Sequence, residues 1–311
     1  MERSVPPFGP ESQLLPAPDV GRYVPGHPRV PLDDTTLLWN LLEKEFCAAD
    51  LDRIAPYLWC MTKQDSKNIS ALHRQRVKGR NIILTEDPKL HLVWIHDRIF
   101  LKPLPQYLSS YTFWRQHLLD DDDDPRRAHI RRAALGFLRS YYYLIQYESD
   151  LRIAQEPSLC LVPAAFNWEQ FCAFTSNLAN IPDDQVSPRY AYGEIRLTRL
   201  NSWAPLLIGK MDFQRAEYQY GAYFAGFYGP ILFVTCVVSV ILSGLQIVAT
   251  VEQEDVRATE TALWISVIAI VACSSLLFSM WSLLVFKIAK EWRFALLDRR
   301  RLGKERQGGS V

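Results

Sequence analysis

The stretches GPILFVTCVVSVILSGLQIVATV at Gly229–Val251 and LWISVIAIVACSSLLFSMWSLLVF at Leu263–Phe286 decide how this chain is organised. Neither stretch contains an aspartate, glutamate, lysine or arginine. Because a helix rises about 1.5 Å per residue, about 20 residues cross a hydrocarbon core of roughly 30 Å, so both stretches are long enough. A buried helix of a soluble protein seldom lacks charge on every face over such a length. The sequence therefore predicts two transmembrane helices, at residues 222–251 and 262–286.

The charges beside these helices predict their orientation. Residues 252–261 hold four acidic residues and one basic residue, whereas residues 287–311 hold eight basic and three acidic ones. Basic flanks stay in the cytosol, so we expect an acidic outer loop, a basic cytosolic tail and both termini in the cytosol. The expected localisation is a membrane, of unspecified type, and the lipid bilayer is one expected partner. Six tail residues are candidates for contact with anionic headgroups: Lys287, Lys290, Arg293, Arg299, Arg300 and Arg301.

The chain before the first apolar stretch divides into two parts. Residues 1–32 contain eight prolines, a composition that predicts a disordered or loosely draped terminus. Residues 33–221 show mainly helical periodicity and predict a cytosolic, mostly helical domain. The expected fold class is therefore mostly α: an α+β soluble domain with a small β-hairpin, followed by a two-helix transmembrane hairpin.

Periodicity and capping signals place the elements of this domain. Helices are expected in TLLWNLLEKEF after Asp33–Asp34, over Leu51–Met61, over Ile69–Lys78, from Asp124–Pro125 to Glu156–Pro157, from Asn167, and from about Tyr190 towards Ile208 with a kink near Pro205. Strands are expected in NIILT at Asn81–Thr85 and in Leu90–Pro103, as a hairpin that turns at His96–Arg98. The expected helix faces are Leu37, Leu38, Leu41 and Leu42 in the first helix, and Ile130, Ala134, Phe137, Tyr141, Leu144, Ile145 and Leu151 in the long one.

No motif indicates catalysis or a bound cofactor. The chain has no HExxH, GxSxG, P-loop or GxGxxG signature, and its net charge of +1 gives no field for nucleic acid. The run Asp120–Asp124 is either a Ca²⁺ or Mg²⁺ site or the acidic start of a helix, and the second is favoured because it lacks EF-hand spacing. His91 and His96 fall on opposite faces of one strand, which argues against joint metal binding. We expect no enzyme activity, cofactor, metal or nucleic-acid partner.

Small and polar residues recur within the two apolar stretches. Ser239 and Ser243 lie four positions apart, as do Ser275 and Ser279, and this spacing lets helices approach closely. Gln246 adds an amide that needs a partner in hydrocarbon. These residues are either a packing face for self-association or a protein partner, or the polar lining of a pore in an oligomer.

Four stretches together resemble one protein family. They are DRIFLKPLPQYLSSYTFW at Asp97–Trp114, ESDLRIAQE at Glu148–Glu156, RYAYGEIRLTRLN at Arg189–Asn201 and LSGLQIVAT at Leu242–Thr250. The family consists of uncharacterised fungal membrane proteins with two C-terminal transmembrane helices, and the resemblance covers about residues 37–286. It implies this architecture and a fungal origin, and it supplies no catalytic residue. Arg196 and Arg199, in the third stretch, are expected near one helical face, in contact with the domain, with lipid or with a partner.

The architecture is also similar to that of the CorA-type magnesium channels, which have a large cytosolic domain, two C-terminal helices, an acidic outer loop and a basic tail. Those channels carry Gly-Met-Asn after the first helix, where this chain reads Gly244–Leu245–Gln246. The expected function is a membrane-anchored interaction or scaffold domain. The alternative is an oligomeric two-helix cation channel or transporter without that signature. On the cytosolic side, the glycosylation sequon Asn68–Ile69–Ser70 would stay unmodified.

Overall fold

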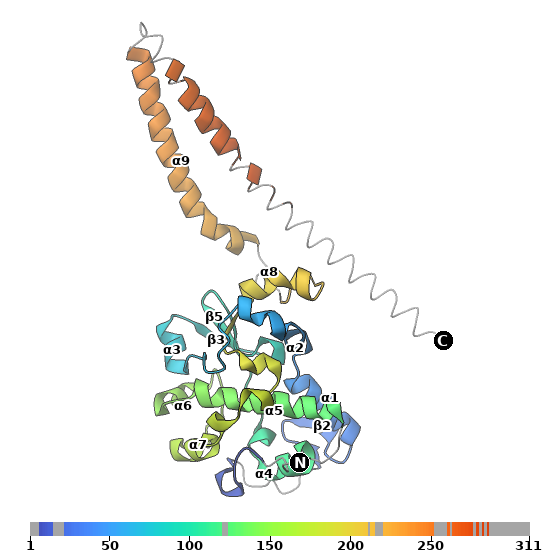
Figure 1. Cartoon of the computed structure of the whole chain (residues 1–311). Helices are drawn as coiled ribbons and strands as arrows, with labels where there is room; N and C mark the ends of the chain where they lie inside the picture. The colour runs from blue at the N-terminus through green and yellow to red at the C-terminus, as the bar shows by residue number, and fades with distance from the viewer. Residues whose placement is uncertain are drawn as a thin grey trace, which may run out of the picture. The chain divides into compact units, whose positions relative to one another are not determined.

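The computed structural model describes residues 6–14, 22–119, 124–210, 212–214, 220–251, 260–261, 263–275, 278–279, 282 and 285. The chain divides into two compact units, Met1–Gln214 and Arg215–Val311 (Figure 1).

The first unit is built mainly from short helices, as expected. Its α-helices are α1 (Thr35–Phe46), α2 (Ala49–Ile54), α3 (Leu72–Val77), α4 (Tyr111–Phe113), α5 (Pro125–Leu144), α6 (Glu148–Ala154), α7 (Trp168–Thr175) and α8 (Leu197–Leu207). The tighter turns are η1 (Pro10–Ser12), η2 (Ala55–Cys60), η3 (Pro88–Leu90), η4 (Gln106–Ser109), η6 (Leu178–Asn180), η7 (Asp183–Gln185) and η8 (Pro188–Ala191), and η5 (Trp114–Leu118) is a π-helix.

A small four-stranded sheet has the order β3–β5–β4–β6. Its strands are β3 (Asn81–Leu84), β4 (Val93–Ile95), β5 (Arg98–Leu101) and β6 (Ile195–Arg196). β4 and β5 form the expected antiparallel hairpin, whose turn places His96 at a φ of 49°. β3 pairs in parallel with β5, and β6 pairs in parallel with β4. The expected strand and hairpin are confirmed, and β6 is an addition.

Helix α5 runs through the core of the first unit. Asp124 caps it, since its carboxylate accepts a hydrogen bond from the backbone N–H of Arg126 at 2.9 Å. α1 packs beside α5, and the ring centres of Phe46 and Phe137 lie 5.6 Å apart. The interpretation of the acidic run as a helix start is thus confirmed for Asp124, whereas residues 120–123 lie outside the described part of the chain.

The single long helix expected after Asp124 is wrong, because α5 and α6 are separate helices. The carboxylate of Asp150 accepts hydrogen bonds from the backbone N–H groups of Gln146 and Tyr147 at 3.1 and 3.0 Å. This cap starts a new helix and turns the chain between the two. The helical spacing of apolar residues continues across the break, because Leu151 in α6 is buried as well. That spacing is why the sequence predicts one helix.

Three other helix predictions need correction. The expected helix over Leu51–Met61 is α2 followed by the tighter turn η2. α8 starts at Leu197 rather than near Tyr190, because η8 and β6 occupy the preceding residues. In α1, Leu38 and Leu42 are buried as expected, but Leu37 is exposed. α7 begins after Asn167 with a capping box, as the sequence predicts.

The described parts of residues 1–32 are packed against the domain, which differs from the expected disordered or loosely draped terminus. Phe8 is 2% exposed, and its ring centre lies 4.7 Å from that of Phe174 in α7. Strands β1 (Tyr23–Val24) and β2 (His27–Pro31) form a short antiparallel pair. Prolines lower the number of apolar anchors in such a segment, but three buried side chains, Phe8, Leu14 and Val24, still fix it.

The second unit contains α9 (Tyr220–Val251) and a further helical stretch at residues 263–275. Helix α9 covers the first predicted transmembrane segment. By the length and hydropathy that a membrane span requires, none of the helices within the described residues qualifies. The transmembrane hairpin therefore stays a prediction.

Candidate functional site: a buried polar network around Lys102

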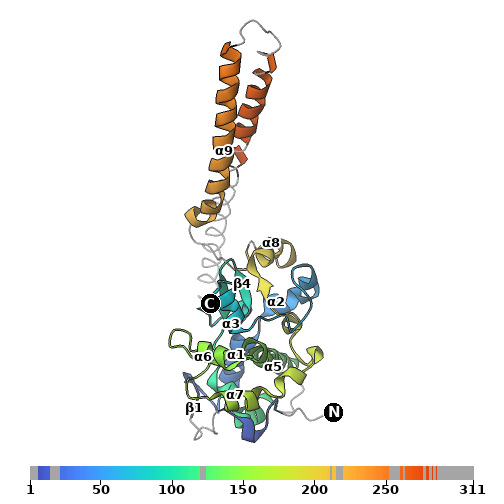
Figure 2. The same ribbon diagram turned by 90° about the vertical axis from the view of Figure 1, so that its left-hand side faces the viewer.

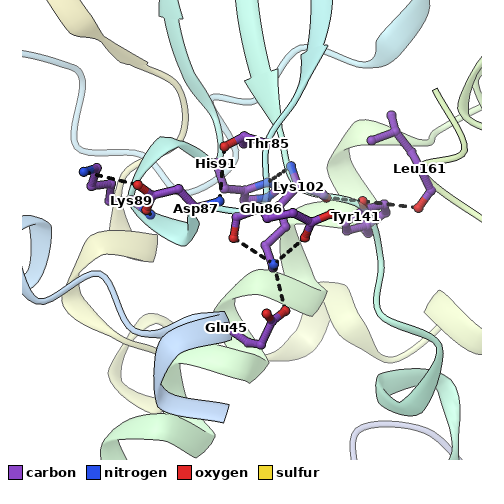
Figure 3. A network of polar contacts seen from close by, with 9 residues as sticks. All are labelled: Glu45, Thr85, Glu86, Asp87, Lys89, His91, Lys102, Tyr141 and Leu161. Carbon is purple, nitrogen blue, oxygen red and sulfur yellow. Dashed lines mark hydrogen bonds and ion pairs between the residues drawn. The ribbon is translucent and has the colours of Figure 1, made fainter. Parts of the chain in front are cut away.

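A lysine with no exposed surface lies where the sheet meets α1. Lys102 directly follows β5, and its side chain is 0% exposed. Its Nζ lies 2.8 Å from Oε2 of Glu45 and 3.0 Å from both Oε2 and the carbonyl oxygen of Glu86 (Figure 3). The ammonium donates two hydrogen bonds to Glu86 and forms an ion pair with Glu45.

The two carboxylates come from different elements and differ in exposure. Glu45 belongs to the last turn of α1, and its side chain is 12% exposed, whereas Glu86 lies in the loop after β3 and is 80% exposed. A buried ammonium needs both opposite charge and hydrogen bonds to offset its lost hydration. The pair Lys102–Glu45 therefore ties α1 to the sheet, while Glu86 covers it from the solvent side.

His91 extends the network towards α5 and is held in one tautomer. Its Nδ1 accepts the backbone N–H of Lys102 at 3.2 Å, and its Nε2 lies 2.8 Å from Oγ of Ser140. Ser140 in turn donates to the carbonyl of Phe137 at 2.6 Å, so we assign the ring proton to Nε2 of His91. Burial, with the positive charges of Arg189 and Lys102, holds the pKa of His91 well below its ordinary value. The imidazole is therefore neutral.

Tyr141, also in α5, and Arg189 in η8 complete the network. The Tyr141 hydroxyl donates to the Lys102 carbonyl at 2.6 Å. The buried Arg189 guanidinium donates to the carbonyls of His91, Tyr192 and Gly193 at 3.1, 2.9 and 3.1 Å. Burial lowers the pKa of Arg189 to about 10, which leaves the group charged at neutral pH. The network joins the sheet, α1, α5 and the η8 segment.

The hydroxyl of Tyr107, beside this network, differs from those of Ser140 and Tyr141 in its hydrogen bonding. Within the described residues, the buried hydroxyl of Tyr107 has no hydrogen-bond partner. Burial and then the carboxylates of Glu45 and Glu86 raise the pKa of Tyr107 well above its ordinary value, so the phenol stays protonated.

The contacts of this network are those of a structural network that holds neighbouring elements together. The Lys102 ammonium, both nitrogens of His91 and the hydroxyl of Ser140 are all engaged in the contacts given above. A catalytic base or nucleophile needs a lone pair or proton that a substrate can reach. In the described part of the chain, no group of three or more histidines, cysteines and acidic residues is placed to hold a metal ion.

The structure separates the residues that the sequence singled out in the domain. His91 is buried in the network, whereas His96 is exposed at the hairpin turn. Arg196 belongs to β6 and not to a helix, and its guanidinium lies 5.2 Å from the ring centre of Trp94. Arg199, in α8, donates to the carbonyl of Met61. The expectation that Arg196 and Arg199 share a helical face is therefore wrong, although both contact the domain.

The polar residues predicted in the apolar stretches are helical and exposed. These are Ser239, Ser243 and Gln246 in α9, and Ser275 and Ser279. Ser243 donates its hydroxyl to the carbonyl of Ser239 at 2.9 Å. The six candidate headgroup contacts, Lys287, Lys290, Arg293, Arg299, Arg300 and Arg301, lie outside the described residues.

Sequence reasoning missed Lys102, Glu45 and Tyr141 as members of one site. One signal was available, because Lys102 directly follows the buried strand residues of β5. A lysine in such a position needs an acidic partner. Which glutamate supplies it depends on how α1 packs against the sheet.

Comparison with known proteins identifies one relationship. The model of a family of unknown function, DUF6601, matches residues 38–273. No curated protein and no solved structure matches the chain.

Proposed function

The chain belongs to the family of unknown function DUF6601, and from this premise we propose that it is a fungal membrane-anchored interaction or scaffold protein. In this proposal, the C-terminal hairpin holds the chain in a bilayer with both termini in the cytosol. The first unit is presented at the membrane surface, where it binds a protein partner.

The observation that carries the proposal is the composition of α9. The helix runs for 32 residues without a charged side chain. Large apolar side chains such as Leu232, Phe233 and Val240 are exposed along it. Exposed apolar surface of this extent needs a lipid or protein environment to cover it. The basic tail and the acidic segment 252–261 support insertion with the tail in the cytosol.

Alkaline extraction of membranes tests the anchor. We expect the full chain to stay in the membrane pellet at high pH and to float with vesicles on a density gradient. Replacing Val237 and Ile241 by lysine should lower the pelleted fraction, because each charge at a helix centre opposes insertion by about 3 kcal/mol. Val77→Lys, at an exposed position of α3, is the matched control. Recovery of the unaltered chain in the alkaline supernatant would refute the anchor.

A second candidate function is an oligomeric cation channel. Ser239, Ser243 and Gln246 are spaced by four and three residues, so they share one face of α9, and all three are exposed. Such a stripe suits either close helix packing or a polar pore lining. The subunit count in detergent or nanodiscs separates these possibilities. A monomer or dimer excludes the pore, because so few helices cannot enclose a hydrated path, whereas a closed ring of subunits would favour it over the anchor.

A further inference from the structure

Helix α8 lies beside the α2–η2 segment at one end of the first unit (Figures 1 and 2). Lys210, after the end of α8, pairs with Asp50 in the first turn of α2. Arg199, in the first turn of α8, donates to the carbonyl of Met61 after the end of η2. The two contacts fix the segments in antiparallel directions.

Both segments expose large apolar side chains. Tyr57 and Trp59 in η2 are 53% and 66% exposed, and Trp203 and Leu206 in α8 are 41% and 76% exposed. Trp203 and Leu206 are three positions apart and therefore share a helical face. We name these four side chains the aromatic ridge.

The two segments that carry the aromatic ridge have a small positive net charge. Residues 195–210 contain two arginines and one lysine and no acidic residue, and residues 49–60 add two acidic residues and one basic residue. Tryptophan and tyrosine favour the interface between water and lipid, and basic side chains are attracted to anionic headgroups. Exposed aromatic and aliphatic side chains beside basic residues, with no acidic residue in α8, are typical of a segment that lies on a membrane surface.

The connection between the end of the first unit and α9 is short in sequence. The side-chain oxygen of Asn201 in α8 accepts the backbone N–H groups of Phe213 and Gln214 at 2.9 and 3.1 Å. The chain after α8 is thereby held against it as far as Gln214. Tyr220, the first residue of α9, follows six positions later. Six residues span at most about 20 Å.

We propose that the aromatic ridge docks onto the headgroup region of the bilayer that holds α9, with a preference for anionic lipid. This inference rests on the proposed function, because the short connection brings the ridge to a bilayer only if α9 enters one. Docking would orient the first unit and leave its other end, with α7, directed away from the membrane.

Two native cysteines provide a matched pair of probes. Cys60 in η2 is exposed and follows Trp59, and Cys172 in α7 is also exposed. Helix α7 lies at the end of the first unit opposite α8 (Figures 1 and 2). Two full chains are prepared, one that keeps Cys60 as its only cysteine and one that keeps Cys172 as its only cysteine. Each carries a nitroxide label and is placed in nanodiscs with or without anionic lipid. We expect the Cys60 label to lose accessibility to a water-soluble nickel chelate and to gain accessibility to oxygen, most strongly with anionic lipid. The Cys172 label should remain accessible to the chelate.

Substitutions separate docking from anchoring. Trp59→Ser with Leu206→Ser should restore chelate access at Cys60 while the chain still resists alkaline extraction, and Val77→Ser should change neither result. Chains that anchor but show equal chelate access at Cys60 and Cys172 would overturn docking and leave the anchor intact. Shielding of Cys60 that grows with protein concentration in detergent would instead assign the ridge to a second copy of the chain. Chains that do not anchor would remove the premise of both proposals.

Discussion

At the scale of single residues, the most consequential group of the first unit is the buried ammonium of Lys102. Replacing it by methionine would leave the Glu45 carboxylate, 12% exposed, without its partner. Breaking a buried pair from one side costs about 3–5 kcal/mol, because the remaining charge is uncompensated. We expect Lys102→Met to lower the free energy of unfolding by this amount, measured by urea denaturation in detergent followed by near-ultraviolet circular dichroism.

Glu86→Gln is the control for this prediction. Its carboxylate reaches the same ammonium but is 80% exposed, so its loss should cost at most about 1 kcal/mol. The carbonyl of Glu86 still accepts from Lys102 in this variant. If Lys102→Met and Glu86→Gln cost the same, the buried pair with Glu45 does not hold α1 on the sheet.

His91 predicts a dependence of stability on pH. Because its pKa is lowered well below 6.5 in the folded state, the unfolded chain binds a proton first as the pH falls. The free energy of unfolding should therefore decrease below about pH 6.5, by up to roughly 1.4 kcal/mol per pH unit until the folded-state pKa is reached. In His91→Gln, the amide can accept from Lys102 and donate to Ser140, and this part of the slope should disappear.

The control for the pH dependence is His96→Asn, at the exposed hairpin turn. Asparagine tolerates the positive φ of 49° at this position, so the fold should be kept. The free energy of unfolding is measured between pH 5 and 7 for the unaltered chain, His91→Gln and His96→Asn. An unchanged slope in His91→Gln would show that another group titrates in this range.

Some of these residue roles were predictable from sequence and others were not. The cap of α5 was predictable, because Asp124 and Pro125 act on the helix that directly follows them. The Lys102 network was not, because Glu45 lies 57 positions away in the chain and only the packing of α1 brings it near. Capping and periodicity describe neighbours in the sequence and do not predict the distance between residues as far apart as Glu45 and Lys102.

At the scale of elements, the break between α5 and α6 depends on one carboxylate. Asp150 is fully buried and accepts the backbone N–H and the ring Nδ1 of His73 at 2.7 and 2.8 Å, in addition to the N–H groups of Gln146 and Tyr147. An asparagine would turn an N–H₂ group towards some of these donors. We expect Asp150→Asn to cost about 1–3 kcal/mol, since it leaves buried donors unpaired.

Hydrogen exchange can locate this effect. The amides of His73, Gln146 and Tyr147 should exchange faster in Asp150→Asn, while those of α7 should change little. Glu148→Gln is the control, because the Glu148 side chain is 55% exposed and pairs only at the surface with Arg152. Equal protection of the three amides in both variants would show that the carboxylate does not maintain the break.

Elements whose signals are local were predicted best. The β4–β5 hairpin follows from alternation around a turn, and α7 follows from the cap at Asn167. Periodicity predicts a helix where strand β6 lies, because the pairing of β6 with β4 joins residues about a hundred positions apart and leaves no local signal. The end of α5 was missed because the apolar period runs on into α6, whereas the cap at Asp150 acts through backbone groups that periodicity does not describe.

At the scale of the whole molecule, the chain combines a packed unit with a second unit of different composition. Buried polar contacts such as Lys102–Glu45 hold the first unit together, while α9 exposes apolar side chains between Leu232 and Ile247. A soluble interaction domain needs no such helix, whereas an anchored domain needs a folded unit and an apolar helix. The proposed membrane-anchored interaction domain would use both units.

Glycosylation mapping tests the orientation that this function requires. A sequon in a Gly–Ser spacer inserted between Asp255 and Val256 should be glycosylated, because the acidic segment 252–261 is expected on the outer side. The native Asn68–Ile69–Ser70 should stay unmodified although Asn68 is exposed, because the first unit is expected in the cytosol.

The readout is a mobility shift that an endoglycosidase removes, and Asn68→Gln in the same chain assigns the shift to one site. The expected orientation follows from charge, since residues 287–311 carry eight basic and three acidic side chains. Exchanging the tail's six candidate headgroup contacts for glutamine should therefore weaken the preference and give a mixed population. Glycosylation of Asn68 together with an unmodified spacer sequon would place the first unit on the outer side of the membrane. The aromatic ridge would then have to dock onto an outer leaflet that is poor in anionic lipid.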